Sequence, residues 1–364
     1  MMNNKYRISI IESMDEWAKI SEPWNKLLQQ SKSDTIFLTW EWLYTWGKHY
    51  LGKDRSLFLV VFYEDNEIVG IAPWYIHSFN FGPFTLRQIE FLGCPEAGSD
   101  YIDVFTKERK EKEIAQLVYH YLFSEIAGRW DLIMLQNMPS HSLFLLNFLQ
   151  EIKKNRKYYE IQDGAFCPFL FLPGKREEFN DGLSQSRRRR ITYDTNVLNR
   201  DGKVNYQTFQ PMNEAIPLER FIALYKQKWG KNKEEFCSFL KDFLSLGGEK
   251  KWVNIDILSV NGKDIAGLFL LRYQDTLFMY LMAVDTDYNR KISVGNVLTA
   301  LSIEKAISDG FLIYDFLKGD EEYKFYWAKE GKRSLNLFAC QKKPGTMFFV
   351  SKKLIKHLAK VILK

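Results

Sequence analysis

Alternating apolar and polar positions predict a defined order of helices and strands in the second half of the chain. Residues 221–231 carry apolar side chains at helical spacing and end in Trp-Gly-Lys. The segments 253–260 and 265–273 alternate as strands do, and the dipeptide Asn261-Gly262 between them is typical of a two-residue hairpin turn. The remaining predicted elements are a strand at 276–284, a helix at 294–308 closed by Gly310, and a strand at 311–317.

The first half of the chain repeats this order. Residues 41–48 are helical and also end in Trp-Gly-Lys, and a hairpin follows whose turn is Asp65-Asn66. In its second strand, residues 68–71 (Ile-Val-Gly-Ile) correspond to residues 265–268 (Ile-Ala-Gly-Leu). The repeat predicts an α/β fold of two tandem domains and favours this over one large sheet. The predicted elements of the first copy are strands at 57–63, 68–76, 84–92 and 131–136 and a helix at 112–127.

Length and composition narrow the class of protein. The chain has 364 residues, 46% of them hydrophobic, which is enough for a full core in each of two domains. The formal net charge of +6 fits an enzyme with anionic ligands such as phosphates better than a nucleic-acid-binding protein. No apolar run approaches the ~20 residues that span a bilayer, and residues 1–12 lack an apolar core of signal-peptide length. We therefore expect a cytoplasmic protein that neither binds nucleic acid nor inserts into a membrane.

The cysteines and histidines do not predict a metal site. Cys94, Cys167, Cys237 and Cys340 lie far apart, no Cys-x-x-Cys pair occurs, and the five histidines are equally scattered. Because a structural zinc site needs clustered ligands, we expect no metal and four buried or inert thiols.

A candidate anion-binding segment lies between the strand at 276–284 and the helix at 294–308. Glycine-rich signatures of hydrolases, kinases and dinucleotide-binding proteins are missing from the sequence. The segment 290–296 has small residues that let a pyrophosphate approach the backbone, and free N–H groups at the helix start point at the anion. The alternative is an N-cap at Ser293 with a tightly packed Gly295. The candidate ligand-binding residues are Arg290, Lys291, Ser293, Val294, Gly295 and Asn296.

This segment resembles the acyl-CoA loop of the GNAT acyltransferase superfamily, which reads Gln/Arg-x-x-Gly-x-Gly/Ala at the same junction. Arg290, Ser293 and Gly295 match the loop, with Ser293 in place of the first glycine. Serine constrains the backbone more than glycine does. The closer resemblance is to the CelD/BcsL-type branch, which is found with bacterial polysaccharide genes. Its marks are Phe37-Leu38 with Trp40, Trp42 and Trp46, residues 99–103, the arginines after Ser186, and residues 314–321 followed by Tyr323-Lys324 and Trp327.

The resemblance implies two tandem GNAT-like domains related to the FemAB type, each a mixed central sheet flanked by helices, with acyl-CoA bound by the second copy. The sequence agrees, because residues 101–116 at the equivalent junction of the first copy contain Lys and Glu but no glycine. Such a junction cannot cradle a pyrophosphate. The expected division is a degenerate N-terminal domain at 1–170, an acyl-CoA-binding domain at 171–350 and a basic C-terminal helix at 351–364, with a linker near 168–181.

The resemblance also implies direct acyl transfer from the thioester to an amine. The amine must lose a proton, and Asp315 or Asp320 is the expected base. Backbone N–H groups of the strand before Arg290 would bind the oxyanion. Lys324 resembles a lysine that related peptidyltransferases use to steady negative charge, and Tyr323 is a proton donor for the leaving thiolate. The alternatives are a turn or capping role for the aspartates, a solvated lysine and a packed tyrosine.

Two further groups of residues are candidates for substrate contacts. Four consecutive arginines on a helix point in all directions, so only Arg187 or Arg190 is expected to bind a phosphate of substrate or CoA. Nucleic-acid binding by this run is disfavoured because no aromatic platform lies beside it. Ser99, Asp100 and Tyr101 suit contacts with a sugar or a base. The alternative is an Asx turn at Asp100 with Tyr101 in the core.

These predictions favour an acyl-CoA-dependent N-acyltransferase that acts on a nucleotide-linked amino sugar in bacterial surface polysaccharide synthesis, the substrate being implied by the family context. Two alternatives stay open, an aminoacyl-tRNA-dependent ligase of the peptidoglycan type and a non-catalytic binding domain. The ligase is disfavoured because the second half lacks a long, charged, heptad-patterned helical hairpin. Gly295 and Lys324 argue against the binding domain.

Overall fold

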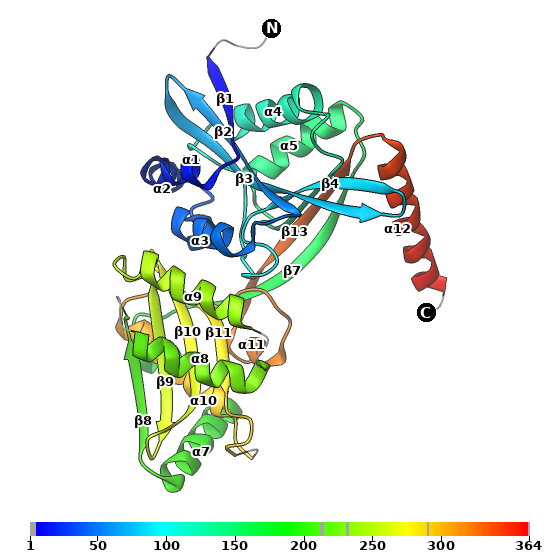
Figure 1. Cartoon of the computed structure of the whole chain (residues 1–364). Helices are drawn as coiled ribbons and strands as arrows, with labels where there is room; N and C mark the ends of the chain where they lie inside the picture. Colours follow the sequence, from blue (N-terminus) through cyan, green and yellow to red (C-terminus); the bar gives the residue numbers. More distant parts are fainter. Residues whose placement is uncertain (1–4, 212–214, 231–232, 290, 363–364) are drawn as a thin grey trace. The chain divides into compact units, whose positions relative to one another are not determined.

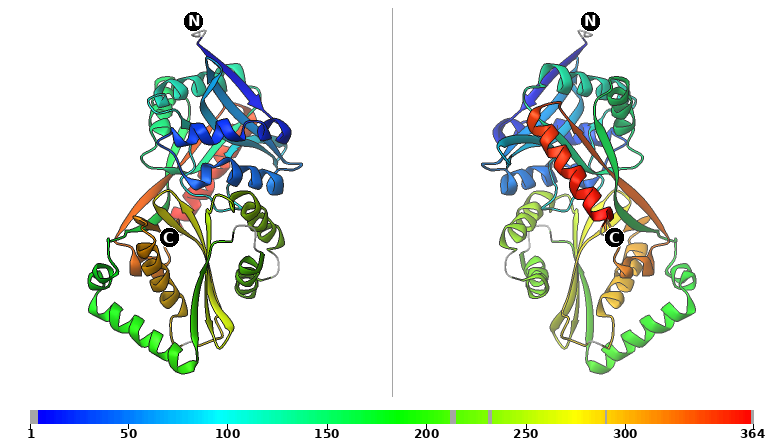
Figure 2. Two further views of the ribbon diagram at one scale, coloured as in Figure 1. Left: turned by 90° about the vertical axis from the view of Figure 1, so that its left-hand side faces the viewer. Right: turned by 90° about the vertical axis from the view of Figure 1, so that its right-hand side faces the viewer.

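The protein is described by a computed structural model that covers residues 5–211, 215–230, 233–289 and 291–362. It divides into two compact units. Unit 1 consists of residues 1–165 and 333–364, and unit 2 consists of residues 166–332. Each unit is a mixed sheet flanked by helices (Figures 1 and 2), as the sequence predicts.

The sheet of unit 1 is antiparallel except for one parallel pair. Its strands, in spatial order, are β1 (Tyr6–Ile11), β2 (Arg55–Glu64), β3 (Glu67–Phe81), β4 (Phe84–Phe91), β6 (Leu132–Pro139) and β13 (Glu330–Cys340). The parallel pair is β4 and β6, and a short strand β5 (Phe105–Thr106) pairs with β3.

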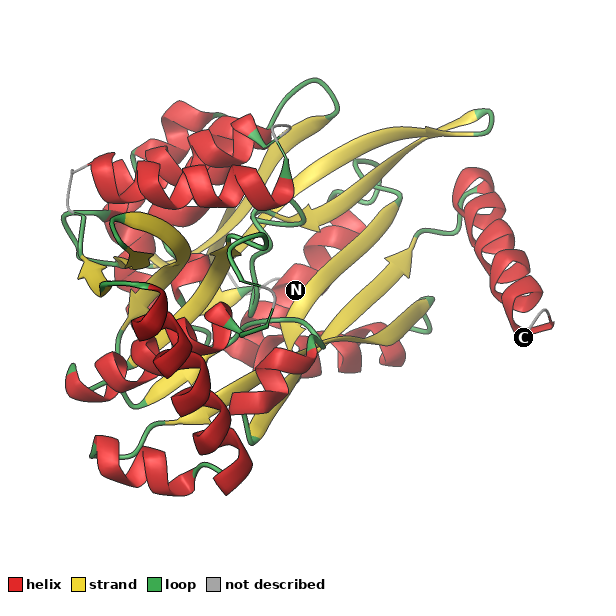
Figure 3. Ribbon diagram, turned by 90° about the horizontal axis from the view of Figure 1, so that it is seen from below, coloured by secondary structure: helices red, strands yellow, loops and turns green. Residues whose placement is uncertain are grey.

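Aromatic side chains dominate the core of unit 1. Trp24, Trp42 and Trp46 are fully buried beside this sheet. At the C-terminus, helix α12 (Figure 3) packs Phe349 against Phe81, with ring centroids 4.9 Å apart. The helices of unit 1 are α1 (Met14–Ala18), α2 (Ser21–Gln29), the 3-10 turn η1 (Ile36–Leu38), α3 (Trp40–Tyr50), α4 (Glu111–His120), the π-helical turn η2 (Tyr121–Glu125), α5 (Leu143–Lys154) and α12 (Pro344–Ile362).

The sheet of unit 2 has the same arrangement. Its strands, in spatial order, are β8 (Val204–Phe209), β9 (Val253–Val260), β10 (Lys263–Tyr273), β11 (Thr276–Val284), β12 (Ile313–Asp315) and β7 (Tyr159–Phe171). Only β11 and β12 pair in parallel. The helices are α6 (Arg176–Gly182), α7 (Gln185–Asp201), α8 (Ala215–Trp229), α9 (Glu234–Gly247), α10 (Val294–Ser308) and α11 (Glu322–Trp327).

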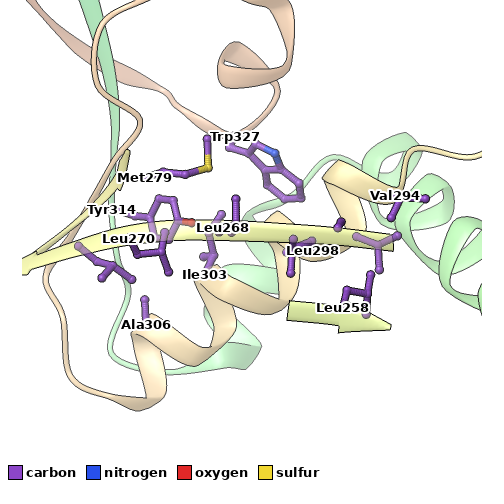
Figure 4. Packing of buried hydrophobic residues seen from close by; sticks show 14 of the residues in the cluster. Leu258, Leu268, Leu270, Met279, Val294, Leu298, Ile303, Ala306, Tyr314 and Trp327 are labelled. Carbon is purple, nitrogen blue, oxygen red and sulfur yellow. The ribbon is translucent and has the colours of Figure 1, made fainter. Parts of the chain in front are cut away.

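Helices cover both faces of the sheet of unit 2 (Figure 2). On one face, Leu298 and Ile303 of α10 join Leu268 in a buried cluster (Figure 4). On the other face, Phe221 of α8 lies 5.9 Å from Phe269, measured between ring centroids. Because successive side chains of a strand point to opposite faces, Leu268 and Phe269 of β10 contact the two different helix layers.

The two units confirm the internal repeat, but one detail of the predicted correspondence is wrong. The hairpin turns are flanked by the pairs Glu64–Glu67 and Val260–Lys263, so Gly70 is equivalent to Ala266 and not to Gly267. A Cβ added to Gly70 would meet Ile114 of α4, whereas one added to Gly267 would meet Phe221 of α8. The two glycines therefore face different helix layers.

The chain passes between the units within two strands rather than in a loop. Residues 168–171 of the expected linker belong to β7, and its residues from 176 onward form α6. At the other end, residues 333–340 of β13 pair with β6 in unit 1, although the sequence places them in the second domain.

Candidate functional site

Strand β11 of unit 2 pairs with β12 over only part of its length. Its parallel pairing with β12 covers only three residue pairs and ends at Phe278 opposite Asp315. Directly after this point the register with β10 shifts, which leaves Tyr280 as an extra residue in a β-bulge. Strand β12 ends at Asp315, whereas β11 continues to Val284, so residues 279–284 lie beyond this pairing.

The first turn of α10 packs against side chains of the last part of β11. A Cβ added to Gly295 would lie 3.3 Å from the sulfur of Met282 and 3.5 Å from Val284, both in β11. Ser293 is the N-cap, and its hydroxyl accepts a hydrogen bond from the N–H of Asn296 at 3.4 Å. The remaining N–H groups of the first turn have no partner within the helix, so they suit an anion.

The structure brings most of the expected loop residues together at this helix start. Lys291 is exposed, Ser293, Gly295 and Asn296 are partly buried, and Val294 is buried. Arg290 lies outside the described residues. Ser293 acts as the N-cap that the alternative interpretation proposed, and this role leaves the other first-turn N–H groups in place.

Helix α7 contacts the segment before α10. The guanidinium of Arg190 donates a hydrogen bond to the carbonyl of Lys291 at 2.9 Å and another to Oδ2 of Asp194 at 3.0 Å. The same carboxylate oxygen accepts the N–H of Ser293 at 3.2 Å. Arg190 is therefore engaged with the backbone of the candidate loop.

One turn earlier on α7, Arg187 contacts helix α11. Its guanidinium lies 4.7 Å from the ring centroid of Tyr326 and donates to the carbonyl of Phe325 at 3.5 Å. The hydroxyl of Tyr326 donates in return to the carbonyl of Arg187 at 3.3 Å. Because Arg187 and Arg190 are three residues apart, one helix turn links α11 to the segment before α10.

Asp315 and Lys324 hold the turn that follows β12. Asp315 is buried, and its Oδ1 accepts the N–H of Leu317 at 2.7 Å. Lys324 is buried, with only 4% of its surface exposed. It donates to the carbonyl of Leu317 at 3.3 Å and to that of Lys318, and it forms an ion pair with Glu321 at 3.0 Å. The alternative of a solvated lysine is therefore wrong.

Tyr323 and Asp320 differ from these two residues in their surroundings. Tyr323 is partly buried against the core of unit 2, and burial, followed by the charge of Glu321, raises the pKa of its phenol. The phenol is thus protonated at neutral pH and able to donate. Asp320 is exposed.

The residues predicted to contact the substrate that accepts the acyl group, Ser99, Asp100 and Tyr101, belong to unit 1. Ser99 is fully buried, and its hydroxyl accepts from Nε1 of Trp42 at 2.8 Å and donates to the carbonyl of Gly93 at 2.8 Å. Asp100 is also buried, while Tyr101 is partly exposed and has a φ of +57°. Tyr101 is therefore the member of this group that stays accessible to a ligand.

The junction of the first copy contains a buried acid, Asp103. Asp103 accepts the hydroxyl of Ser33 at 3.0 Å and the N–H of Val104 at 2.9 Å. Burial raises the pKa of Asp103 to about 7. The adjacent cavity has a volume of about 30 Å³, which is room for a single water molecule.

Sequence reasoning did not identify Asp194, which joins the loop to α7. The available signal was its spacing of four residues from Arg190, which is typical of a helical ion pair. Among the described residues, no group of His, Cys, Asp and Glu suits a metal ion. Within the same ranges, no helix combines the length and apolarity that crossing a membrane requires.

One family model matches part of unit 2. Residues 185–325, all within unit 2, match the family model of the acetyltransferase (GNAT) domain. A comparison of the sequence with curated proteins finds no match. The CelD/BcsL-type assignment stays a prediction.

Solved structures resemble the whole chain in fold. FemX is 10% identical, with a TM-score of 0.60 over 93% of this chain and 98% of that chain. L-PGS from Bacillus licheniformis is 13% identical, with a TM-score of 0.54 over 91% and 96%. A conserved protein of unknown function from Bacteroides thetaiotaomicron VPI-5482 is 12% identical, with a TM-score of 0.51 over 92% and 100%. At these identities the likeness concerns the fold alone.

Proposed function

We propose that unit 2 binds acyl-CoA and transfers its acyl group to the amine of a nucleotide-linked amino sugar. The observation that carries the proposal is the position of Gly295, where the first turn of α10 packs against β11 beyond the end of its pairing with β12. A pyrophosphate suits the helix N-terminus, and an extended amide-containing arm suits the part of β11 that continues past β12. The family match over residues 185–325 supports the same class of donor.

Asp320 is the proposed base for the attacking amine. The amine nitrogen attacks the thioester carbonyl carbon, and the nitrogen must give up a proton for the amide to form. Asp315 is buried and already accepts the N–H of Leu317, whereas Asp320 is exposed. The difference in access favours Asp320 for proton removal and Asp315 for holding the turn.

Tyr323 is the proposed proton donor for the leaving thiolate. Breakage of the C–S bond leaves a negative sulfur, which becomes a neutral thiol when it takes a proton. The phenol of Tyr323 is protonated at neutral pH, and its place on α11, next to Lys324, supports its choice as the donor. Lys324, on the same helix, would act by fixing the preceding turn through its bonds to Leu317 and Lys318.

The amino sugar, its nucleotide carrier and a role in cytoplasmic polysaccharide synthesis rest on the resemblance to the CelD/BcsL-type branch. The net charge of +6 is compatible with two phosphate-bearing substrates. Arg187 and Arg190 retain a proposed electrostatic role, since both guanidinium groups lie near the candidate site while bonded to backbone carbonyls.

A panel of acyl-CoAs and amino sugars, free and nucleotide-linked, tests this function through release of free thiol. We expect thiol release only when both an acyl-CoA and an amine are present. Binding of acyl-CoA without thiol release toward any acceptor would instead support a non-catalytic binding domain. Transfer from aminoacyl-tRNA in the absence of any reaction with acyl-CoA would support the ligase.

A further inference from the structure

Asp194 is the buried contact between α7 and the start of α10. Its side chain is only 1% exposed, and its Oδ2 accepts both the N–H of Ser293 and Nε of Arg190. These bonds join the carboxylate to the N-cap of α10 on one side and, through Arg190, to the carbonyl of Lys291 on the other. Both ends of the segment 291–293 are thus fixed to α7.

Burial of the other carboxylate oxygen of Asp194 lowers the stability of the folded protein. Oδ1 is buried, and none of the described residues donates a hydrogen bond to it. Leaving a buried carboxylate oxygen unpaired offsets the gain from its ion pair. The contribution that remains specific to this carboxylate is therefore the geometry that it gives to Ser293 and Lys291.

We infer that Asp194 is a positioning residue for acyl-CoA, which it serves by holding the segment 291–293 so that the first turn of α10 faces the ligand. The inference rests on the proposed function. Asp194 uses the N–H of Ser293, and the N–H groups of Val294 and Gly295, which have no partner within the helix, are left for the pyrophosphate. Arg190, 49% exposed at its side chain, offsets the negative charge beside the bound anion.

Two variants of Asp194 separate positioning from general loss of structure. Asp194→Ala removes the acceptor of Ser293 and should raise KM for acyl-CoA about tenfold, the effect of roughly one lost hydrogen bond to a charged group. The value of kcat and the KM of the amine should stay within about twofold. Asp194→Asn keeps an acceptor oxygen at the same place and should restore KM to within about threefold of the parent.

Asp181→Ala is the matched control. Asp181 pairs with Arg188 at 3.4 Å just before α7, and its side chain is 82% exposed, so the same charge change is made without contact to the loop. We expect parental KM in this variant. A folded Asp194→Ala variant with parental KM for acyl-CoA would overturn the inference.

Amide hydrogen exchange without any CoA provides an independent arm of the test. Exchange at residues 291–296 should be faster in Asp194→Ala than in the parent and in Asp181→Ala. If Asp194→Ala does not fold, Arg190→Ala replaces it, because this exposed side chain holds Lys291 from the same helix. Unchanged exchange in that variant would equally contradict the inference.

The two possible failures are distinguishable. A parent protein that responds to no acyl-CoA contradicts the proposed function, whatever the variants do. A parent that binds acyl-CoA, together with unchanged KM and unchanged exchange in the variants, contradicts only the role of Asp194.

Discussion

Gly319 controls the turn that carries the candidate catalytic residues. Its φ is +133°, and a Cβ at this position would overlap the carboxylate of Glu321 and lie 2.6 Å from Nζ of Lys324. We expect Gly319→Ala to lower the free energy of unfolding by about 3 kcal/mol, because backbone strain of ~1–2 kcal/mol adds to the displacement of the buried Lys324 ammonium from its partners. Denaturant unfolding followed by circular dichroism measures the loss.

Gly310→Ala is the control for this prediction. Gly310 also has a positive φ, +82°, but open space surrounds the position of its Cβ. The free energy of unfolding of Gly310→Ala should therefore fall only by the backbone strain of about 1–2 kcal/mol. Equal losses in the two variants would contradict the steric explanation of the turn.

Replacement of Asp320 separates chemistry from stability. Because its carboxylate is exposed, Asp320→Asn should leave the melting temperature unchanged. If Asp320 removes the proton from the amine, the variant should lose about 10²–10⁴ in kcat with parental acyl-CoA affinity. Steady-state kinetics with saturating acyl-CoA decide this. Parental turnover in Asp320→Asn and also in Asp315→Asn would exclude both carboxylates as the base.

Asp103 predicts a specific pH dependence of stability. Burial raises the pKa of Asp103 to about 7, above the value of ~3.9 in an unfolded chain. The folded state therefore binds the extra proton, and the free energy of unfolding should fall as the pH rises from about 4 to 7, by at most about 1.4 kcal/mol per pH unit. Asp103→Asn should reduce this slope in urea titrations at several pH values. An unchanged slope in the variant would show that another group causes the dependence.

At the scale of elements, local sequence patterns predicted the hairpin strands and the helix after them but missed β13 and α7. Strands β9 and β11 and helix α10 occur at their predicted bounds, because turn chemistry at Asn261-Gly262 and helix capping are encoded by neighbouring residues. Strand β13 was not predicted, since its partner β6 lies about 200 residues earlier in the chain and leaves no local signal. Helix α7 reads as a charged linker because Asp194 and Leu198 are its only buried residues within the described chain.

The pairing of β13 with β6 predicts which fragments fold. A fragment of residues 1–170 lacks β13 and therefore the strand pairing and the buried side chains that Leu337 and Phe338 contribute beside β6. We expect that this fragment does not unfold cooperatively. Residues 1–165 joined by a flexible linker to residues 333–364 should regain a cooperative transition by circular dichroism. Cooperative unfolding of the shorter fragment would show that β13 is dispensable for unit 1.

At the scale of the whole molecule, the sequence predicted the segments of the candidate site but not the contacts that hold them. The sequence located the loop at 291–296 and the residues after β12, because small residues and turn signals mark both segments. It did not reveal that Arg190 is bonded to the carbonyl of Lys291, since this contact joins segments that are far apart in the chain. It also did not reveal that Lys324 bonds to the carbonyl of Leu317, because that contact depends on how the turn between them folds back. The two units share a topology, yet the junction of unit 1 is closed around Asp103.

The central claim is that acyl-CoA binds at the first turn of α10, and stabilisation by acyl-CoA tests it most directly. At a concentration of 100 Kd, the ligand should raise the free energy of unfolding of the parent by about 2.7 kcal/mol. Gly295→Phe fills the space over Met282 and should abolish this gain, while a non-glycine residue is tolerated in the helix itself. Gly174→Phe, made in unit 2 where open space surrounds the Cβ, should keep the full gain. Full stabilisation of a folded Gly295→Phe variant by acyl-CoA would contradict the account.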